Sequence, residues 1–247
     1  MCKFIVGHCA TDTEFDIEKI VLEVSELFEK MGTKIHRYNS ARGKVVKFSQ
    51  SDMNKRIASN SLNSVSLYSE YRGLPSEFDE NENWKAYVAF SKSERDFALA
   101  YTLNDISLKS LFKHMNTFFP TTKLFDYIYG YEETQHYGLG YALDYYSEDD
   151  QHELLSPLSN MIENWETIRR QKLECNYLRD VFEINVFSKN RLRSLGPKKQ
   201  AALAEAMKNF GHAQDFEEKI KWVLNTNEIV NARIMLLKDE VLAAYIR

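Results

Sequence analysis

Residues 84–103, WKAYVAFSKSERDFALAYTL, predict two paired strands, on which the assignment of the fold class rests. Both ends of the stretch alternate apolar side chains with other residues at a period of two, which predicts half-buried antiparallel strands. The polar residues Ser91–Glu94 form a connection short enough to join these two strands in a hairpin. The core-facing positions predicted for the strands are Trp84, Ala86, Val88 and Phe90, and then Phe97, Leu99, Tyr101 and Leu103.

The N-terminal region predicts one short strand and one helix. Residues 4–6 form a brief apolar run that fits a buried strand. Thr11 and Glu14 have the spacing of a capping box, an apolar stripe with helical spacing follows, and Gly32 is placed to end that helix. Residues 37–61 are polar and poorly patterned, so we expect a loop there with a short helix.

The first half of the chain has the element order of a ferredoxin-like fold. Residues 65–71 alternate as a third strand before the hairpin. Ser107 begins a second helix, which ends before Pro120, and residues 124–131 predict a further strand. The order is strand, helix, strands, helix, strand, which predicts a sheet covered on one face by two helices.

The second half begins near Ser147 and continues to alternate helices with strands. The predicted helices cover residues 154–168, residues 197–210 between Gly196 and Gly211, and the segment after a capping box at Asn225 and Glu228. The predicted strands are residues 181–187, 220–224 and 241–246. We therefore predict an α+β protein of mainly antiparallel sheets, with a ferredoxin-like half at 1–146 closely joined to a second α+β half at 147–247.

Composition and charge favour a globular protein of a reducing compartment. The 247 residues carry a net charge of −4, which argues against nucleic acid as a partner. The basic group Arg191, Arg193, Lys198 and Lys199 is interpreted as a solvated loop and helix start. Three unpatterned cysteines predict no disulfide framework, and neither a signal-peptide core nor a membrane-spanning window is present. We expect a cytoplasmic protein that binds no membrane.

The familiar catalytic motifs are absent from the sequence. It contains no GxGxxG, Walker A, GxSxG, HExxH, EF-hand or paired CxxC motif, and we predict no cofactor and no resident metal. The alternative is a dispersed site, such as a metal-dependent hydrolase built from the acids near Asp149 and from His152. Cys9 with a distant histidine would be a nucleophile pair, but a small buried residue at a strand end is the simpler interpretation.

Tyrosines and acids are concentrated in residues 126–150. Tyrosine combines a large apolar body with a polar tip, which suits a protein-binding surface, and carboxylates beside it favour a basic partner. Tyr127, Tyr129 and Tyr131 alternate on one predicted sheet face, so a structural role is the competing interpretation. The candidate partner-binding residues are Tyr127, Tyr129, Tyr131, Glu132, Glu133, Tyr137, Asp144, Tyr145, Glu148, Asp149 and Asp150.

Two further features of the sequence predict close packing. Gly138 and Gly140 indicate a tight turn or a close backbone approach next to the tyrosine face. Arg179 and Asp180 lie between apolar residues, and buried charges must be paired. Strand alternation would give these two residues different partners, and we expect them to anchor the structure.

The segment 177–192, YLRDVFEINVFSKNRL, resembles one found in uncharacterised bacterial proteins, several of which are immunity partners of polymorphic or type VI secreted toxins. The segments 66–73 and 137–141 are compatible with that group. The resemblance implies a protein that neutralises a toxin by stoichiometric masking, and it implies no catalytic residue. The remaining alternative is a structural or regulatory module that acts as a homodimer, with the Tyr127, Tyr129 and Tyr131 face in the dimer contact.

Overall fold

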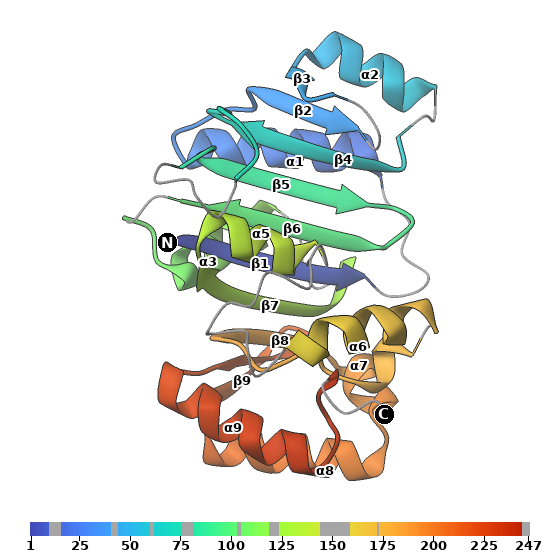
Figure 1. The fold of residues 1–247 in the computed structure, drawn as a ribbon, viewed down its shortest axis with the longest axis vertical. Helices are drawn as coiled ribbons and strands as arrows, with labels where there is room; N and C mark the ends of the chain where they lie inside the picture. Colours follow the sequence, from blue (N-terminus) through green and yellow to red (C-terminus); the bar gives the residue numbers. More distant parts are fainter. Residues whose placement is uncertain are drawn as a thin grey trace. The chain divides into compact units, whose positions relative to one another are not determined.

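The computed structural model describes residues 1–9, 16–40, 44–59, 62–75, 82–102, 105–118, 124–143, 159–171 and 173–243. The chain divides into two compact units (Figure 1). The first contains Met1–Phe125 and Glu132–Leu139, and the second contains Asp126–Tyr131 and Gly140–Arg247. The predicted class is confirmed, because antiparallel strand pairs and helices make up both units.

The first unit is built on an antiparallel sheet in the order β3-β2-β4-β5-β6-β1. The predicted hairpin is present, with Val88 of β5 opposite Leu99 of β6. Its strands are not half-buried as predicted, because Tyr87 and Ala100 on the second face are also buried. The strand bounds are β1 Cys2–Cys9, β2 Arg37–Ser40, β3 Val46–Lys47, β4 Ser64–Ser69, β5 Ala86–Ser91 and β6 Asp96–Tyr101.

Two helices of the first unit, α1 (Ile17–Lys30) and α3 (Leu108–Phe118), lie against each other behind the sheet in Figure 1. Asp16 caps α1 by accepting a hydrogen bond from the Lys19 amide; the predicted capping-box residues Thr11 and Glu14 lie outside the described residues. Gly32 ends α1 with a positive φ of 71°, as predicted. The Thr33 amide then donates to the Phe28 carbonyl, which completes a Schellman motif.

Residues 37–61 contain more regular structure than a loop with a short helix. The short helix is present as α2 (Gln50–Ala58), but β2 and β3 were not predicted. Tyr38 explains why this polar segment is ordered, because its hydroxyl donates to Asp52 and its ring lies beside the Arg56 guanidinium. These contacts join α2 to β2 through side chains that carry no alternating apolar pattern.

The second unit has an antiparallel sheet in the order β7-β8-β10-β9. Its strands are β7 Phe125–Glu133, β8 Ile184–Ser188, β9 His212–Phe216 and β10 Lys219–Val223. The strand predicted at 241–246 is wrong over its described residues, because Leu242 makes only an isolated bridge to Leu178. Strand β9 was missed because its side chains are largely exposed.

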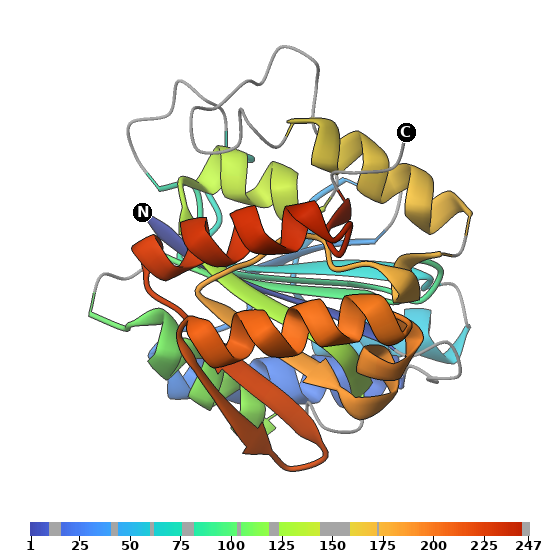
Figure 2. The same ribbon diagram turned by 90° about the horizontal axis from the view of Figure 1, so that it is seen from below.

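Helices α8 (Pro197–Asn209) and α9 (Thr226–Lys238) pack side by side in the second unit (Figure 2). The predicted proline start of α8 and the capping box of Asn225 with Glu228 are both present. The remaining helical elements are α5 Gln135–Ala142, α6 Ser159–Arg170, the 3₁₀ turn η2 Glu174–Asn176 and α7 Lys189–Ser194.

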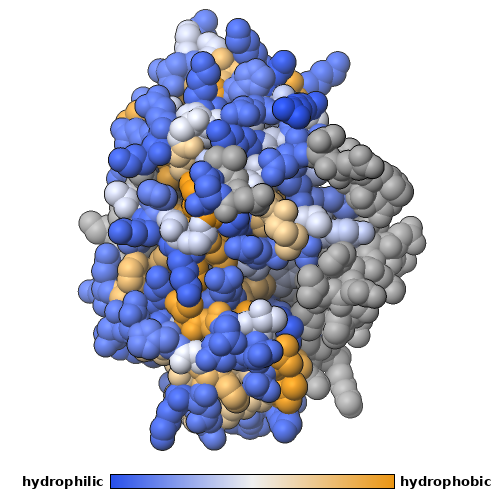
Figure 3. Space-filling model, turned by 90° about the vertical axis from the view of Figure 1, so that its left-hand side faces the viewer, coloured by the Kyte–Doolittle hydropathy of each residue, from blue (hydrophilic) through white to orange (hydrophobic). Residues whose placement is uncertain are grey.

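The face drawn in Figure 3 is mostly hydrophilic, with hydrophobic residues in smaller groups among the polar ones. Among the described residues, no helix combines the length and the apolar character that crossing a membrane requires.

Candidate functional site

The tyrosines of β7 share one face of their strand, as the alternation predicted. The ring centroids of Tyr127 and Tyr129 are 5.3 Å apart, and those of Tyr129 and Tyr131 are 6.1 Å apart. Tyr129 also stacks on Phe182 at 4.2 Å, and Tyr127 stacks on Phe187 at 5.5 Å. These contacts make an aromatic core within the second unit.

Tyr127 and Tyr129 are each 0% exposed, so they cannot form a partner-binding surface in this structure. The same burial removes them from the homodimer contact considered above. Burial raises the pKa of Tyr127 and of Tyr141 well above the ordinary value of a tyrosine. The physical reason for the correction is that Phe182 and Phe187 already occupy the face these tyrosines present.

Other residues of the tyrosine-rich stretch are accessible to different degrees. Glu132 is exposed, and Tyr131 and Tyr137 are half-buried. Glu133 is buried, and its carboxylate accepts a hydrogen bond from the Thr134 amide. The candidates that lie outside the described residues are Asp144, Tyr145, Glu148, Asp149 and Asp150.

The end of β7 and the start of α5 contribute four residues that we group as the α5 surface: Glu132, Thr134, His136 and Tyr137. All four belong to the first unit, and each is exposed or half-buried. The Thr134 hydroxyl accepts a hydrogen bond from the Tyr137 amide at 3.4 Å, and the His136 and Tyr137 rings meet edge to face. The surface therefore combines a carboxylate, two hydroxyls and two aromatic rings.

Gln135 fixes the α5 surface to the sheet of the first unit. Its side-chain nitrogen donates to the Trp84 carbonyl at 2.7 Å, and its side-chain oxygen accepts from the Asn83 amide at 2.8 Å. Both groups belong to the chain that leads into β5. Sequence reasoning missed Gln135, because an uncharged polar residue at a helix start carries no signal of a partner far away in the chain.

Gly138 brings the backbone of α5 directly against β1. A Cβ atom placed on Gly138 would lie 2.1 Å from the Phe4 ring, so no other residue fits there without movement. The prediction of a close backbone approach at this glycine is confirmed. Phe4 projects from the sheet face opposite the one that carries Tyr101, whose hydroxyl donates to the Met31 carbonyl at the end of α1. Helices therefore lie on both faces of this sheet, and α5 is an addition to the two predicted helices.

Arg179 and Asp180 are both buried and have different partners, as predicted. Asp180 accepts two hydrogen bonds from Arg233 of α9. The Arg179 guanidinium lies 3.8 Å from the Tyr141 ring centroid and donates to the Tyr129 hydroxyl at 2.5 Å. These contacts hold the aromatic core of the second unit in place.

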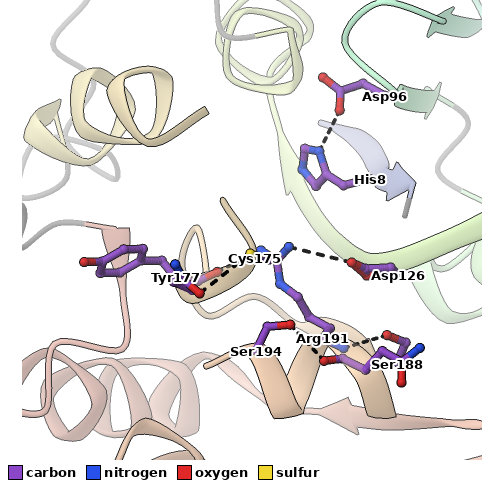
Figure 4. A network of polar contacts seen from close by, with 10 residues as sticks. His8, Asp96, Asp126, Cys175, Tyr177, Ser188, Arg191 and Ser194 are labelled. Carbon is purple, nitrogen blue, oxygen red and sulfur yellow. Dashed lines mark hydrogen bonds and ion pairs between the residues drawn. The ribbon is translucent and has the colours of Figure 1, made fainter. Parts of the chain in front are cut away.

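Arg191 is not the solvated residue that its sequence context suggested. It is 3% exposed, and its guanidinium lies 5.2 Å from the Tyr127 ring centroid. Figure 4 shows it pointing toward Asp126 and toward Tyr177, the residue after the η2 turn, whose carbonyl accepts a hydrogen bond from Arg191 at 2.8 Å. Lys199 also belongs to this packing, since its ammonium lies 3.4 Å from the Tyr177 ring centroid. Two of the four basic candidates are therefore structural.

The described residues hold no group of three or more His, Cys, Asp or Glu side chains placed to bind a metal ion. His8 Nδ1 lies 2.7 Å from Asp96 Oδ1, which joins β1 to β6 (Figure 4). His152, Asp149 and Asp150, on which the hydrolase alternative depends, lie outside the described residues.

No protein-family model matches this chain, and no curated protein matches it. A solved structure that resembles it is a chain from the crystal structure of the toxic C-terminal tip of CdiA from Pseudomonas aeruginosa in complex with immune protein. The two chains are 13% identical with a TM-score of 0.29, over 54% of this chain and 87% of that chain. A likeness of this size assigns neither a fold nor a function.

Proposed function

We propose that this chain is an immunity protein that neutralises a toxin by covering it in a one-to-one complex. The toxin would be of the polymorphic or type VI secreted class suggested by the resemblance of residues 177–192. Masking requires a binding surface and no catalytic group. A surface that masks a toxin needs accessible residues that are preorganised, that is, fixed in their bound arrangement before the toxin binds.

The α5 surface is the observation that carries the proposal. Glu132 and Tyr137 are accessible, and the two hydrogen bonds of Gln135 restrict the helix start that presents Tyr137. Tyrosine is enriched among the residues that dominate protein–protein binding energy, because its rigid ring loses little conformational entropy on binding. A preorganised tyrosine, with an exposed carboxylate five residues before it in the chain, fits a partner with an apolar pocket and basic residues around it.

The partner would be a basic protein, since Glu132 and the net charge of −4 favour opposite charge on the toxin. Complementary charge would speed association and make it sensitive to salt. The hydrolase alternative depends on residues that lie outside the described part of the chain. The Tyr127 and Tyr129 face is too buried to support a homodimer.

The test begins with recovery of the tagged full-length chain from its native cells and identification of co-purified proteins by mass spectrometry. The protein recovered at a one-to-one ratio is then expressed in a bacterial host with and without this chain. We expect the partner alone to stop growth and the pair to grow. Recovery of the chain alone, together with no protection against the toxins encoded beside it, would refute the proposed function.

Two variants then test the surface. Tyr137→Ala and Glu132→Lys should each weaken the complex about tenfold or more, which corresponds to about 1.4 kcal/mol. Leu22→Ala and Glu26→Lys on the exposed side of α1 make matched changes elsewhere in the same unit and should leave the affinity unchanged. Equal effects of the two pairs would place the partner elsewhere on the chain.

A further inference from the structure

The three cysteines of the chain have different environments. Cys2 and Cys9 are 1% and 8% exposed, whereas Cys175 is partly exposed. Burial raises the pKa of the Cys2 thiol far above its ordinary value. A reagent in solution therefore meets Cys175 before it meets either of the other thiols.

Cys175 lies beside a buried cation. It belongs to the η2 turn, and its thiol donates to the Asn176 side-chain oxygen at 3.6 Å. In Figure 4 its sulfur lies close to the Arg191 guanidinium, whose charged neighbours also include Asp126 and Glu174. Partly exposed sulfur atoms in positively charged surroundings are the ones that react in proteins, whereas buried structural cysteines are inert.

The guanidinium of Arg191 has hydrogen-bonding capacity left. One terminal nitrogen donates to the Tyr177 carbonyl, and the other lies 3.9 Å from an Asp126 carboxylate oxygen, which is too long for a hydrogen bond. The Nε–H group is buried and has no hydrogen-bond partner in the part of the chain that the structure describes. A buried donor without an acceptor costs free energy, so an anionic oxygen arriving on the neighbouring sulfur would be favoured.

We propose that Cys175 is a modification site for hydroperoxides, and that Arg191 holds the oxygen added to its sulfur. The thiolate sulfur attacks one oxygen of the peroxide, the S–O bond forms and the O–O bond breaks. With hydrogen peroxide, the second oxygen leaves as hydroxide and takes up the proton released by the thiol, giving water. Sulfur is oxidised by two electrons to a sulfenic acid, and a second equivalent of peroxide gives the sulfinate anion.

The first experiment treats the folded full-length protein with hydrogen peroxide and traps sulfenic acid with dimedone before peptide mass spectrometry. We expect the label on Cys175 to exceed that on Cys2 or Cys9 by about tenfold or more. The same reaction on the chain unfolded in guanidinium chloride should label all three alike. Equal labelling in the folded protein, or slower reaction of Cys175 when folded than when unfolded, would overturn the proposal.

The role of Arg191 is tested by thermal unfolding of the reduced and sulfinate forms. Oxidation should raise the unfolding midpoint of the parent protein and of Arg193→Lys, whose arginine is exposed on the same helix. Arg191→Lys should lose that rise, because a lysine cannot supply the fixed set of guanidinium donors.

If Arg191→Lys does not fold, a second variant, Cys175→Ser, tests whether the rise in the unfolding midpoint comes from oxidation of Cys175. Peroxide treatment of Cys175→Ser should leave the midpoint unchanged, since the two remaining thiols are buried. An unchanged or lowered midpoint in the oxidised parent protein would show that Arg191 does not hold the modified sulfur.

Discussion

Asp180 holds Arg233 through two parallel hydrogen bonds inside the second unit. The Arg233 Nε donates to one carboxylate oxygen at 2.8 Å, and a terminal nitrogen donates to the other at 2.6 Å. Asp180 is only 2% exposed, so its charge depends on this contact. The Asp180 backbone carbonyl also accepts from the Tyr127 hydroxyl at 3.3 Å, which connects the ion pair to the aromatic core.

Asp180→Asn should therefore destabilise the protein strongly. Removing one partner of a buried ion pair leaves the other charge uncompensated, and we expect a loss of about 3–5 kcal/mol in the free energy of unfolding. Urea unfolding followed by circular dichroism measures it. Asp239→Asn is the matched control, because its 3.9 Å contact with Lys198 is largely exposed and should contribute less than about 1 kcal/mol. Equal losses in the two variants would contradict this account.

Gly138→Ala should destabilise the first unit by about 1–3 kcal/mol, the usual cost of overpacking. The added methyl group would overlap the Phe4 ring, which is itself fully buried and cannot swing into solvent. Gly73→Ala provides the comparison, since its Cβ would meet only the Asn83 side-chain oxygen at 3.3 Å. Urea unfolding of both variants measures the difference. A Gly138→Ala protein as stable as the parent would mean that α5 can move off β1 at little cost.

The stability of the protein should fall in alkali between about pH 10 and pH 12. Burial raises the pKa of Tyr68 to about 12, although its hydrogen bond to Ser66 acts the other way, and burial raises that of Tyr101 to about 12 as well. Below about pH 10 these phenols are neutral in both the folded and the unfolded chain, so the full stability is present. Above that pH the unfolded chain ionises first, and stability is lost as pH rises toward the folded pKa.

Tyr68→Phe tests the source of this alkaline loss. The variant should resemble the parent at pH 8 and should lose less stability between pH 10 and pH 12, because one of the ionising phenols is gone. Urea unfolding at a series of pH values measures both slopes. Identical slopes for the parent and for Tyr68→Phe would show that other groups cause the loss.

Much of the fold could be predicted where local chemistry and tertiary packing agree. The hairpin of residues 84–103, the stop at Gly32 and the capping box of Asn225 and Glu228 all follow from short-range rules of spacing and backbone conformation. The strands missed are β2, β3 and β9. They lie at or near sheet edges, where many side chains face solvent and no apolar alternation is required.

The candidate site was harder to predict because burial is a property of the whole unit. The alternation of Tyr127 and Tyr129 gave their shared face correctly, but it could not show that Phe182 and Phe187 cover that face. For Arg191 the prediction was wrong in the opposite direction. A charged residue in a basic segment is usually solvated, but Arg191 lies in the core. The burial of the tyrosine face and the burial of Arg191 both depend on residues that are distant in the sequence.

Gln135→Met should loosen the α5 surface without touching its exposed residues. The variant keeps the length of the side chain and removes the hydrogen bonds that Gln135 makes with the Asn83 amide and the Trp84 carbonyl. Hydrogen exchange at the Asn83 amide should become faster, and the affinity for a toxin partner should fall although residue 135 need not contact it. Gln200→Met on α8, which removes one hydrogen bond to the Arg193 carbonyl, should change neither. Faster exchange with unchanged affinity would support the structural role of Gln135. It would also show that the toxin does not bind at the α5 surface.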